Sequence, residues 1–356
     1  MMTANPRWFT KEGWNKMKRI ALNQIQTLFK ALSDTRALYL PVDTGGGADF
    51  KKYEDGVLWS GALNTNRSAK DFFFPQTEDM MSFKVEGKTI EIKEPVRPDE
   101  DFVLFGVRAC DAKSFLLLDR VFLSDPVDSY YQTRREHGVI MTLCCNKPAE
   151  TCFCTAFGID PTAPGGDVAC WQDGDYLYLT ANTDAGETLL WAVDSVLENG
   201  DESAVEEIKA STKAIMEKLP IGNLPLNAFS EEKLLELFGS EQWAKLSEAC
   251  LGCGTCTFVC PTCQCYDIKD FDTGNGIQRF RCWDSCMYSE FTRCAHGNPR
   301  LSQVERFRQR FMHKLVYFPA NNDGEFSCVG CGRCLAKCPI NMNIVKVAKA
   351  LGGANE

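Results

Sequence analysis

Hydrophobic residues follow the period of a helix or of a strand over most of the first part of the chain. In residues 10–32 they recur at steps of three and four, which predicts one amphipathic helix. Short apolar or alternating runs predict strands at residues 37–42, 102–107, 139–143 and 175–180, and a hairpin over residues 83–92 that turns at Glu86-Gly87. The helical period then returns in three stretches, at residues 185–198, 202–219 and 230–249.

This order of elements predicts an α+β fold in two parts. Strands and helices alternate in the first part, whereas the second begins with charged helical segments separated by Pro220 and Pro225. Because proline interrupts helices, we expect the boundary near Pro225. The prediction is an N-terminal mixed α/β domain over residues 1–225, followed by a mainly helical domain over residues 226–356.

Composition narrows the class of protein. The chain has 356 residues, of which 44% are hydrophobic, and a formal net charge of −9. The apolar content excludes a wholly disordered chain, and the negative charge argues against nucleic acid as a partner. No apolar run approaches the roughly 18 residues of a membrane span, and the first residues lack the apolar segment of a secretory signal. We therefore expect a cytoplasmic protein without a membrane span.

The most unusual feature of the composition is the 19 cysteines. Of these, 13 lie between Cys250 and Cys338, and the other 6 lie between Cys110 and Cys170. The count is odd, and we expect a reducing compartment, where clustered thiols indicate metal ligation or catalysis rather than disulfides.

Two cysteine runs have the spacing of bacterial ferredoxins. They are Cys250-x2-Cys253-x2-Cys256-x3-Cys260-Pro261 and Cys328-x2-Cys331-x2-Cys334-x3-Cys338-Pro339. In two-cluster ferredoxins three thiolates of each run bind one four-iron cluster, and the fourth binds the other cluster. Cluster 1 is therefore expected on Cys250, Cys253, Cys256 and Cys338, and cluster 2 on Cys328, Cys331, Cys334 and Cys260.

Structural zinc is the alternative for these runs. Zinc sites usually present two C-x2-C pairs without a trailing C-x3-C-P segment. The spacing therefore favours iron–sulfur chemistry, and we expect the second domain to contain a ferredoxin-like core with two [4Fe-4S] clusters.

A long insert, residues 262–327, separates the two runs. Phe307, Phe311 and Leu315 recur there at steps of four, which predicts a helix. The insert is rich in basic side chains, which would suit a docking face or compensate the charge of anionic clusters. We interpret most of them more simply, as a solvated helix face. They are Arg279, Arg281, Arg293, Arg300, Arg306, Arg308, Arg310 and Lys314.

Cys110, Cys145, Cys152 and Cys154 form a candidate third metal site. Cys110 and Cys145 each follow a predicted strand, and parallel neighbouring strands would bring them to one edge of a sheet. Four convergent thiolates would hold a third [4Fe-4S] cluster or a zinc ion, with iron–sulfur favoured by the rest of the chain. The alternative is four unconnected buried thiols, because this spacing has no standard template. Cys144 is the nearest substitute for Cys145.

No catalytic residue is predicted. Asp111 and the run Arg134-Arg135-Glu136 are interpreted as a helix start and a surface ion-pair cluster. The three histidines are scattered and make no Ser/His/Asp set.

Several segments resemble a family of four-iron dicluster subunits, which includes that of anaerobic sulfite reductase and the sulfhydrogenase beta subunit. In the second half they are CPTCQCYD (260–267), RCWDSCMYSEFT (281–292), HGNPR (296–300), RFRQRFMHK (306–314) and CVGCGRCLAKCP (328–339). In the first half they are FGVRACDAKSFLLLDRVF (105–122), YQTRRE (131–136) and CNKPAETCFC (145–154). Cys263, Cys265 and Cys286 fit the family pattern, and we interpret them as packing near cluster 2. Cys282 and Cys294 depart from it and are interpreted as ordinary buried thiols.

The resemblance implies an electron-transfer subunit of a multi-subunit oxidoreductase, without catalysis of its own. Its partners would be a flavin/NAD(P)-binding reductase subunit and a terminal catalytic subunit of the sulfite reductase, hydrogenase or heterodisulfide-reductase type. Exposed four-iron clusters also suggest an anaerobic setting.

A self-contained iron–sulfur flavoprotein that oxidises NAD(P)H is the alternative function. It would need a phosphate-binding loop, and Gly45-Gly46-Gly47 does not complete a G-x-G-x-x-G motif.

Overall fold

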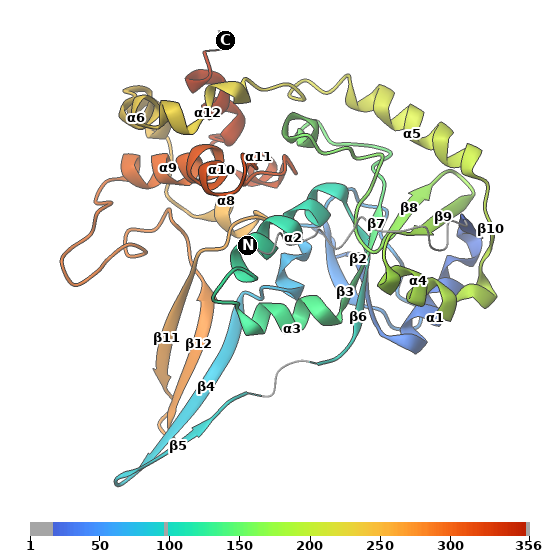
Figure 1. The fold of residues 1–356 in the computed structure, drawn as a ribbon, viewed down its shortest axis with the longest axis horizontal. Helices are drawn as coiled ribbons and strands as arrows, with labels where there is room; N and C mark the ends of the chain where they lie inside the picture. Colours follow the sequence, from blue (N-terminus) through green and yellow to red (C-terminus); the bar gives the residue numbers. More distant parts are fainter. Residues whose placement is uncertain (1–16, 96–98, 354–356) are drawn as a thin grey trace.

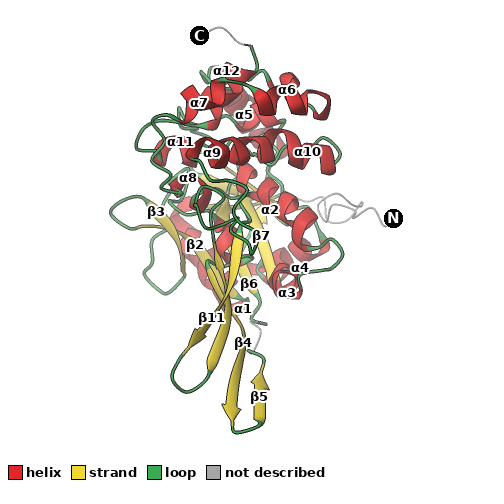
Figure 2. Cartoon of the chain, turned by 90° about the vertical axis from the view of Figure 1, so that its left-hand side faces the viewer, coloured by secondary structure: helices red, strands yellow, loops and turns green. Residues whose placement is uncertain are grey.

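The computed structural model of this protein describes residues 17–95 and 99–353. An eight-stranded sheet with helices on both faces forms the N-terminal part, and a four-stranded sheet projects from the body as an arm (Figure 1). The helices of the C-terminal part gather at the end of the molecule opposite the tip of the arm (Figure 2). Among the described residues, no helix has the length and apolar character needed to cross a lipid bilayer.

The large sheet has parallel strands at its centre and antiparallel strands on both sides. Its strands are β1 (Lys18–Ala21), β2 (Ala37–Asp43), β3 (Ala48–Lys52), β6 (Phe102–Val107), β7 (Gly138–Leu143), β8 (Val168–Gln172), β9 (Tyr176–Ala181) and β10 (Glu198–Asn199). Their order is β10-β1-β9-β8-β7-β6-β2-β3, with β2, β6, β7 and β8 parallel to one another. β6 and β7 are buried along their whole length, which explains their continuous apolar sequences.

Helices cover both faces of this sheet. On one face lie α1 (Ile25–Thr35) and α4 (Asp184–Ala192), and on the other lie α2 (Ala109–Phe122), α3 (Ser129–His137) and α5 (Glu202–Met216). Alternate residues of β7 show the division, since Val139 and Met141 pack with α1 and α4 whereas Ile140 packs with α2. β6 and β7 end at the same edge, so the first turn of α2 and the loop after β7 are neighbours.

The arm joins two segments that lie far apart in the sequence. Its strands are β4 (Thr77–Glu86), β5 (Thr89–Lys93), β11 (Tyr266–Asp272) and β12 (Ile277–Trp283), in the order β11-β12-β4-β5. β12 pairs antiparallel with β4, and at the base of the arm the buried Arg281 forms ion pairs with Glu78 and Asp128. The arm therefore ties the insert between the cysteine runs to the N-terminal part.

The C-terminal part consists of short helices around a second hydrophobic core. They are α6 (Leu234–Gly239), α7 (Gln242–Ser247), α8 (Thr255–Phe258), α9 (Gln303–Met312), α10 (Phe318–Asn321), α11 (Arg333–Lys337) and α12 (Ile344–Leu351). Trp243, Phe307, Phe311 and Leu315 meet in this core. α9 begins with a capping box between Ser302 and Glu305 and continues into a π-helical turn over His313–Tyr317.

The mixed α and β content predicted from the sequence is confirmed. The hairpin and the strand at residues 102–107 are found as predicted. The single helix predicted over residues 10–32 is wrong: residues 10–16 lie outside the described part, Lys18–Ala21 is a strand paired with β9, and α1 begins only at Ile25. β11 and β12 were not predicted. The boundary near Pro225 remains a prediction.

Candidate metal centres

The first set of predicted thiols surrounds one hollow in the C-terminal part. Cys250, Cys253, Cys256 and Cys338 all line it. The backbone N–H of Met342 donates to the Cys338 sulfur at 3.3 Å, and Gln303 Nε2 donates to the Cys250 sulfur at 3.4 Å. Such N–H groups stabilise negative charge on sulfur.

The second set surrounds a neighbouring hollow. Cys328, Cys331, Cys334 and Cys260 line it. Each of the two hollows thus contains one thiol from the other cysteine run, as the ferredoxin spacing predicts.

The third set also meets at one hollow. It is lined by Cys110, in the first turn of α2, by Cys145, which follows β7, and by Cys152 and Cys154 of the next loop. Parallel β6 and β7 thus place two of the thiols at one edge of the sheet, as the sequence predicted. Cys144 does not line the hollow and packs instead with Trp171 and Val205.

The three hollows are contiguous. Arg310 lines both the first and the second, and Gly330 and Cys331 line both the second and the third. Gly330 has a φ of +58°, and a Cβ atom there would lie 2.4 Å from the Phe153 carbonyl oxygen. A Cβ atom at Gly332 would likewise lie 2.5 Å from the Thr151 carbonyl oxygen. Glycine at these positions therefore lets the second cysteine run lie directly against the loop of the third set.

Three basic residues of the insert are buried, two of them among the thiols, which corrects part of the sequence interpretation. Arg281, Arg310 and Lys314 were interpreted with the other basic residues as a solvated face, but all three are buried. Arg310 donates to the Cys256 carbonyl at 3.1 Å. Lys314 Nζ donates to Thr262 Oγ1 at 2.7 Å and to the Ser327 carbonyl at 2.8 Å.

Two further buried cations lie near the third set. Arg108 lines its hollow and donates to the backbone carbonyls of Ala62, Leu63 and Cys144. Arg333 is buried and ion-paired to Asp111. The interpretation of Asp111 as a helix start is confirmed, because it lies in the first turn of α2, and its side chain is buried. Arg108 was missed, and its only signal in the sequence is its place two residues before Cys110.

The run Arg134-Arg135-Glu136 was interpreted as a surface ion-pair cluster. That is wrong for Arg135, which is buried and paired with Asp119. The expected burial of Cys294 is wrong as well, because it is exposed, and Cys282 is half-buried.

Burial controls the protonation of most of these thiols. It raises the pKa of Cys328 and of Cys154 to about 12, and it raises the pKa of Cys110 well above the usual value. Thiols of this kind lose their protons when a metal binds, because the metal ligand is the thiolate.

The donor chemistry fits iron–sulfur clusters, since the four cysteines of each set line one common hollow. Within the described part of the chain, no three His, Cys, Asp or Glu side chains are close enough together to hold one metal ion. The four ligands of a [4Fe-4S] cluster bind different iron atoms and need not meet at one point.

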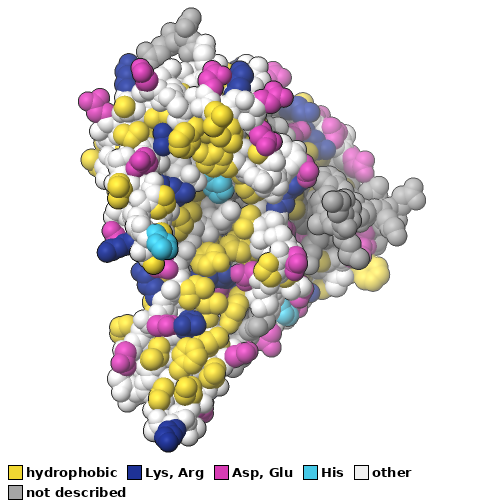
Figure 3. All heavy atoms as spheres, turned by 60° about the vertical axis from the view of Figure 1, so that its left-hand side comes forward, with side chains coloured by type: hydrophobic (Ala, Val, Ile, Leu, Met, Phe, Trp, Pro, Cys, Tyr) yellow, Lys and Arg dark blue, Asp and Glu magenta, His cyan; other side chains and the backbone are white. Residues whose placement is uncertain are grey.

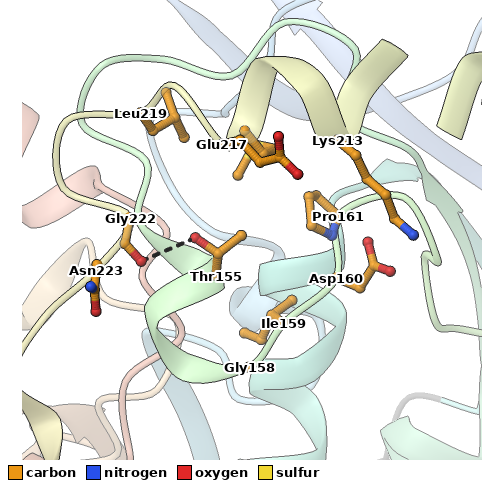
Figure 4. A pocket seen from close by; sticks show the side chains of 11 residues that line it. Thr155, Gly158, Ile159, Asp160, Pro161, Lys213, Glu217, Leu219, Gly222 and Asn223 are labelled. Atoms are coloured by element: carbon orange, nitrogen blue, oxygen red, sulfur yellow. Dashed lines mark hydrogen bonds between the residues drawn. The ribbon is translucent and has the colours of Figure 1, made fainter. Parts of the chain in front are cut away.

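A larger cavity, of about 490 Å³, lies beside the third set. Pro161 and Met216 line both it and the hollow of the third thiols. Figure 4 shows Lys213 and Asp160 close together on one side of the cavity, and Thr155 bonded to the Gly222 carbonyl on another.

Comparisons with known proteins show the family of the chain. Residues 249–342 match the model of a 4Fe-4S dicluster domain. The chain is 35% identical over 278 residues to sulfhydrogenase 2 subunit beta of Pyrococcus furiosus, an alignment that covers 77% of this chain and 80% of the relative. No solved structure matches the chain significantly. The chain is an iron–sulfur protein with two [4Fe-4S] clusters, and it belongs to the family of four-iron dicluster subunits that includes the sulfhydrogenase beta subunit.

Proposed function

We propose that this chain relays single electrons within a hydrogenase-type complex, between a flavin/NAD(P)-binding reductase subunit and a terminal catalytic subunit. The contiguity of the three hollows carries the proposal. Because Cys331 and Gly330 line two hollows and Arg310 lines two, the thiol sets form an unbroken row. A row of redox centres suits a relay, whereas an isolated structural metal would need only one.

The ligands in this proposal are the three sets of cysteines. Cluster 1 would be held by Cys250, Cys253, Cys256 and Cys338; cluster 2 by Cys328, Cys331, Cys334 and Cys260; a third by Cys110, Cys145, Cys152 and Cys154. When bound, such clusters supply reversible redox chemistry at a potential set by hydrogen bonds, charge and solvent exposure.

Other residues near the thiols would determine the hydrogen bonds, the charge and the solvent exposure of the clusters. Four buried cations, each 5% exposed or less, place positive charge near thiols that become anionic thiolates when they bind a cluster. They are Arg108, Arg310, Lys314 and Arg333. N–H groups of Met342 and Gln303 point at the sulfurs of Cys338 and Cys250. Phe153 and Ile344, both buried, line the second hollow and exclude water from it.

The arm supports the proposal that the chain works with partner subunits. Strand pairing places Val85 opposite Ile90 and Phe83 opposite Ile92, with Ile277 beside Phe83, so these side chains share one face. Ile90, Ile92 and Val85 are each more than half exposed. Figure 3 shows hydrophobic side chains gathered along the arm. An apolar face of this kind is typical of a protein–protein contact.

Cysteine variants test the relay. Cys256→Ala and Cys334→Ala should each remove one cluster signal and block transfer from the flavoprotein to the catalytic subunit, with the N-terminal part still folded. The Cys282→Ala variant, at a thiol outside all three hollows, is the control. Wild-type turnover of the complex with Cys256→Ala or Cys334→Ala would contradict the ligand assignment.

The cavity beside the third set favours a second candidate, a self-contained flavoprotein that oxidises NAD(P)H. Its volume of about 490 Å³ falls within the range of small-molecule sites. Reduction and NAD(P)H-oxidation assays on the purified chain discriminate between the two functions. A relay subunit is reduced by dithionite but does not oxidise NAD(P)H without its partner. Bound flavin together with NAD(P)H oxidation by the chain alone would overturn the relay.

A further inference from the structure

Two cysteines outside the three sets lie in contact at the base of the arm. Cys265 immediately precedes β11, and Cys286 follows β12 by three residues. The thiol and the backbone N–H of Cys286 lie close enough to the Cys265 sulfur to lower the pKa of Cys265, and the pKa of Cys286 is raised in turn. The backbone N–H of Asp284 donates to the Cys265 carbonyl at 2.9 Å, which holds the two strand ends together.

This pair is tied to the loops of both C-terminal thiol sets. On one side, Ser285 Oγ and Thr257 Oγ1 are hydrogen-bonded at 2.8 Å, which joins the neighbour of Cys286 to the neighbour of Cys256. On the other side, Cys263 lies two residues before Cys265, and its thiol is near enough to that of Cys260 to lower the pKa of Cys260. The neighbours of this pair therefore contact the loops proposed to hold cluster 1 and cluster 2.

The surroundings favour thiol chemistry. Cys265 and Cys286 are both half-buried. The hydrogen bonds from Cys286, together with the buried Lys314 and Lys70, lower the pKa of Cys265 to about 7. A thiol with a pKa near the ambient pH is the most effective partner in disulfide exchange.

We propose that Cys265 and Cys286 form a redox-active dithiol, which closes to a disulfide and stores two electrons beside the relay. This inference rests on the proposed electron-transfer function. Closing the disulfide forms one sulfur–sulfur bond, breaks two S–H bonds, and releases two protons to solvent and two electrons. The electrons pass singly to two oxidised [4Fe-4S] clusters, and opening the disulfide reverses each step. Such a pair would match one-electron centres to a two-electron partner such as a flavin.

Thiol labelling at controlled potential tests the proposal on the intact, cluster-loaded chain. Samples are equilibrated anaerobically at defined potentials with mediators, quenched in acid, alkylated and digested. The peptides that contain Cys265 and Cys286 are then identified by mass spectrometry. Both peptides should be alkylated at low potential and disulfide-linked at high potential, with a two-electron slope of about 30 mV per decade. Full alkylation of both at every potential, or linkage of Cys265 to Cys263 instead, would overturn the proposal.

Variants and spectra separate this proposal from the relay itself. Coulometric titration of Cys265→Ser and of Cys286→Ser should each take up two electrons fewer per chain than the wild type. The Cys282→Ser variant, at a half-buried thiol on the same arm, should take up the wild-type number. Electron paramagnetic resonance on the same samples reports the clusters. Normal cluster signals with an unchanged electron count in Cys265→Ser would overturn the dithiol alone, whereas missing cluster signals in the wild type would overturn the relay.

Discussion

Arg333 and Asp111 join the second cysteine run to the N-terminal part through a buried bidentate ion pair. The guanidinium donates to both carboxylate oxygens, at 2.6 and 2.7 Å, and each side chain is 3% exposed. Arg333 lies between Cys331 and Cys334, and Asp111 follows Cys110, so the pair bridges the second and third thiol sets. Arg333 also donates to the Thr65 carbonyl at 2.9 Å.

Removing one member of this pair should destabilise the protein strongly. Arg333→Met leaves the Asp111 carboxylate buried without its partner, which costs about 3–5 kcal/mol at sites of this kind. Thermal unfolding measures the effect. The double variant Arg333→Met/Asp111→Leu removes both charges and should recover part of the loss. Arg293→Ala, at an exposed ion pair with Glu290, is the control and should unfold at the wild-type temperature. Equal stability of Arg333→Met and Arg293→Ala would show that the buried pair is unimportant.

A side chain at Gly330 should separate the second and third sets. In Gly330→Ala the new Cβ would meet the Phe153 carbonyl at 2.4 Å, so one of the two loops must move. We expect a loss of about 1–3 kcal/mol and a lower iron content. Gly158→Ala is the matched control, because Gly158 also has a positive φ, +70°, but a Cβ there meets no atom within 4 Å. An iron content as high in Gly330→Ala as in Gly158→Ala would contradict the close contact.

Lys314 should raise the reduction potential of cluster 2. Its Nζ donates to Thr262 Oγ1, which lies 3.2 Å from the Cys260 sulfur. Reduction adds negative charge, which a nearby cation stabilises, so Lys314→Met should lower the potential by on the order of 100 mV at an effective dielectric of about 20. A redox titration followed by electron paramagnetic resonance checks this, with the exposed Lys269→Met as control. An unchanged or higher potential in Lys314→Met would exclude this role.

His313 should make stability depend on pH. Burial lowers its pKa to about 4, below its ordinary 6.5, so the folded state binds the proton less well than the unfolded state. Stability is therefore lost as the pH falls below 6.5, by about 1.4 kcal/mol at pH 5.5, and the loss levels off below pH 4. The unfolding temperatures of the wild type and of His313→Gln should thus converge between pH 7.5 and pH 5.5. A constant difference over that range would contradict the assignment.

The cysteines of the thiol sets could be predicted from the sequence, whereas most of the residues around them could not. The ferredoxin spacing predicted which cysteines meet in the first two hollows, because a tight loop brings its own thiols together. For the third set the sequence leaves two alternatives, because only the parallel pairing of β6 and β7 places Cys110 beside Cys145.

The buried cations could not be predicted, because burial depends on contacts between distant segments. Arg333 and Asp111 are 222 positions apart in the sequence. Arg281 and Glu78, which also form a buried ion pair, are 203 positions apart. In the sequence each of these resembles an ordinary surface charge. The strand Lys18–Ala21 was missed for the same reason, since pairing with β9 outweighs its local helical pattern.

The iron content of the anaerobically purified chain tests the central claim most directly. Three clusters require about twelve irons and about twelve acid-labile sulfides per chain, all in four-iron Mössbauer signals. The Cys145→Ser variant should lose about four of them, whereas Cys144→Ser, at the adjacent thiol outside the hollow, should keep all. About eight irons in the wild type, unchanged in Cys145→Ser, would contradict a row of three centres.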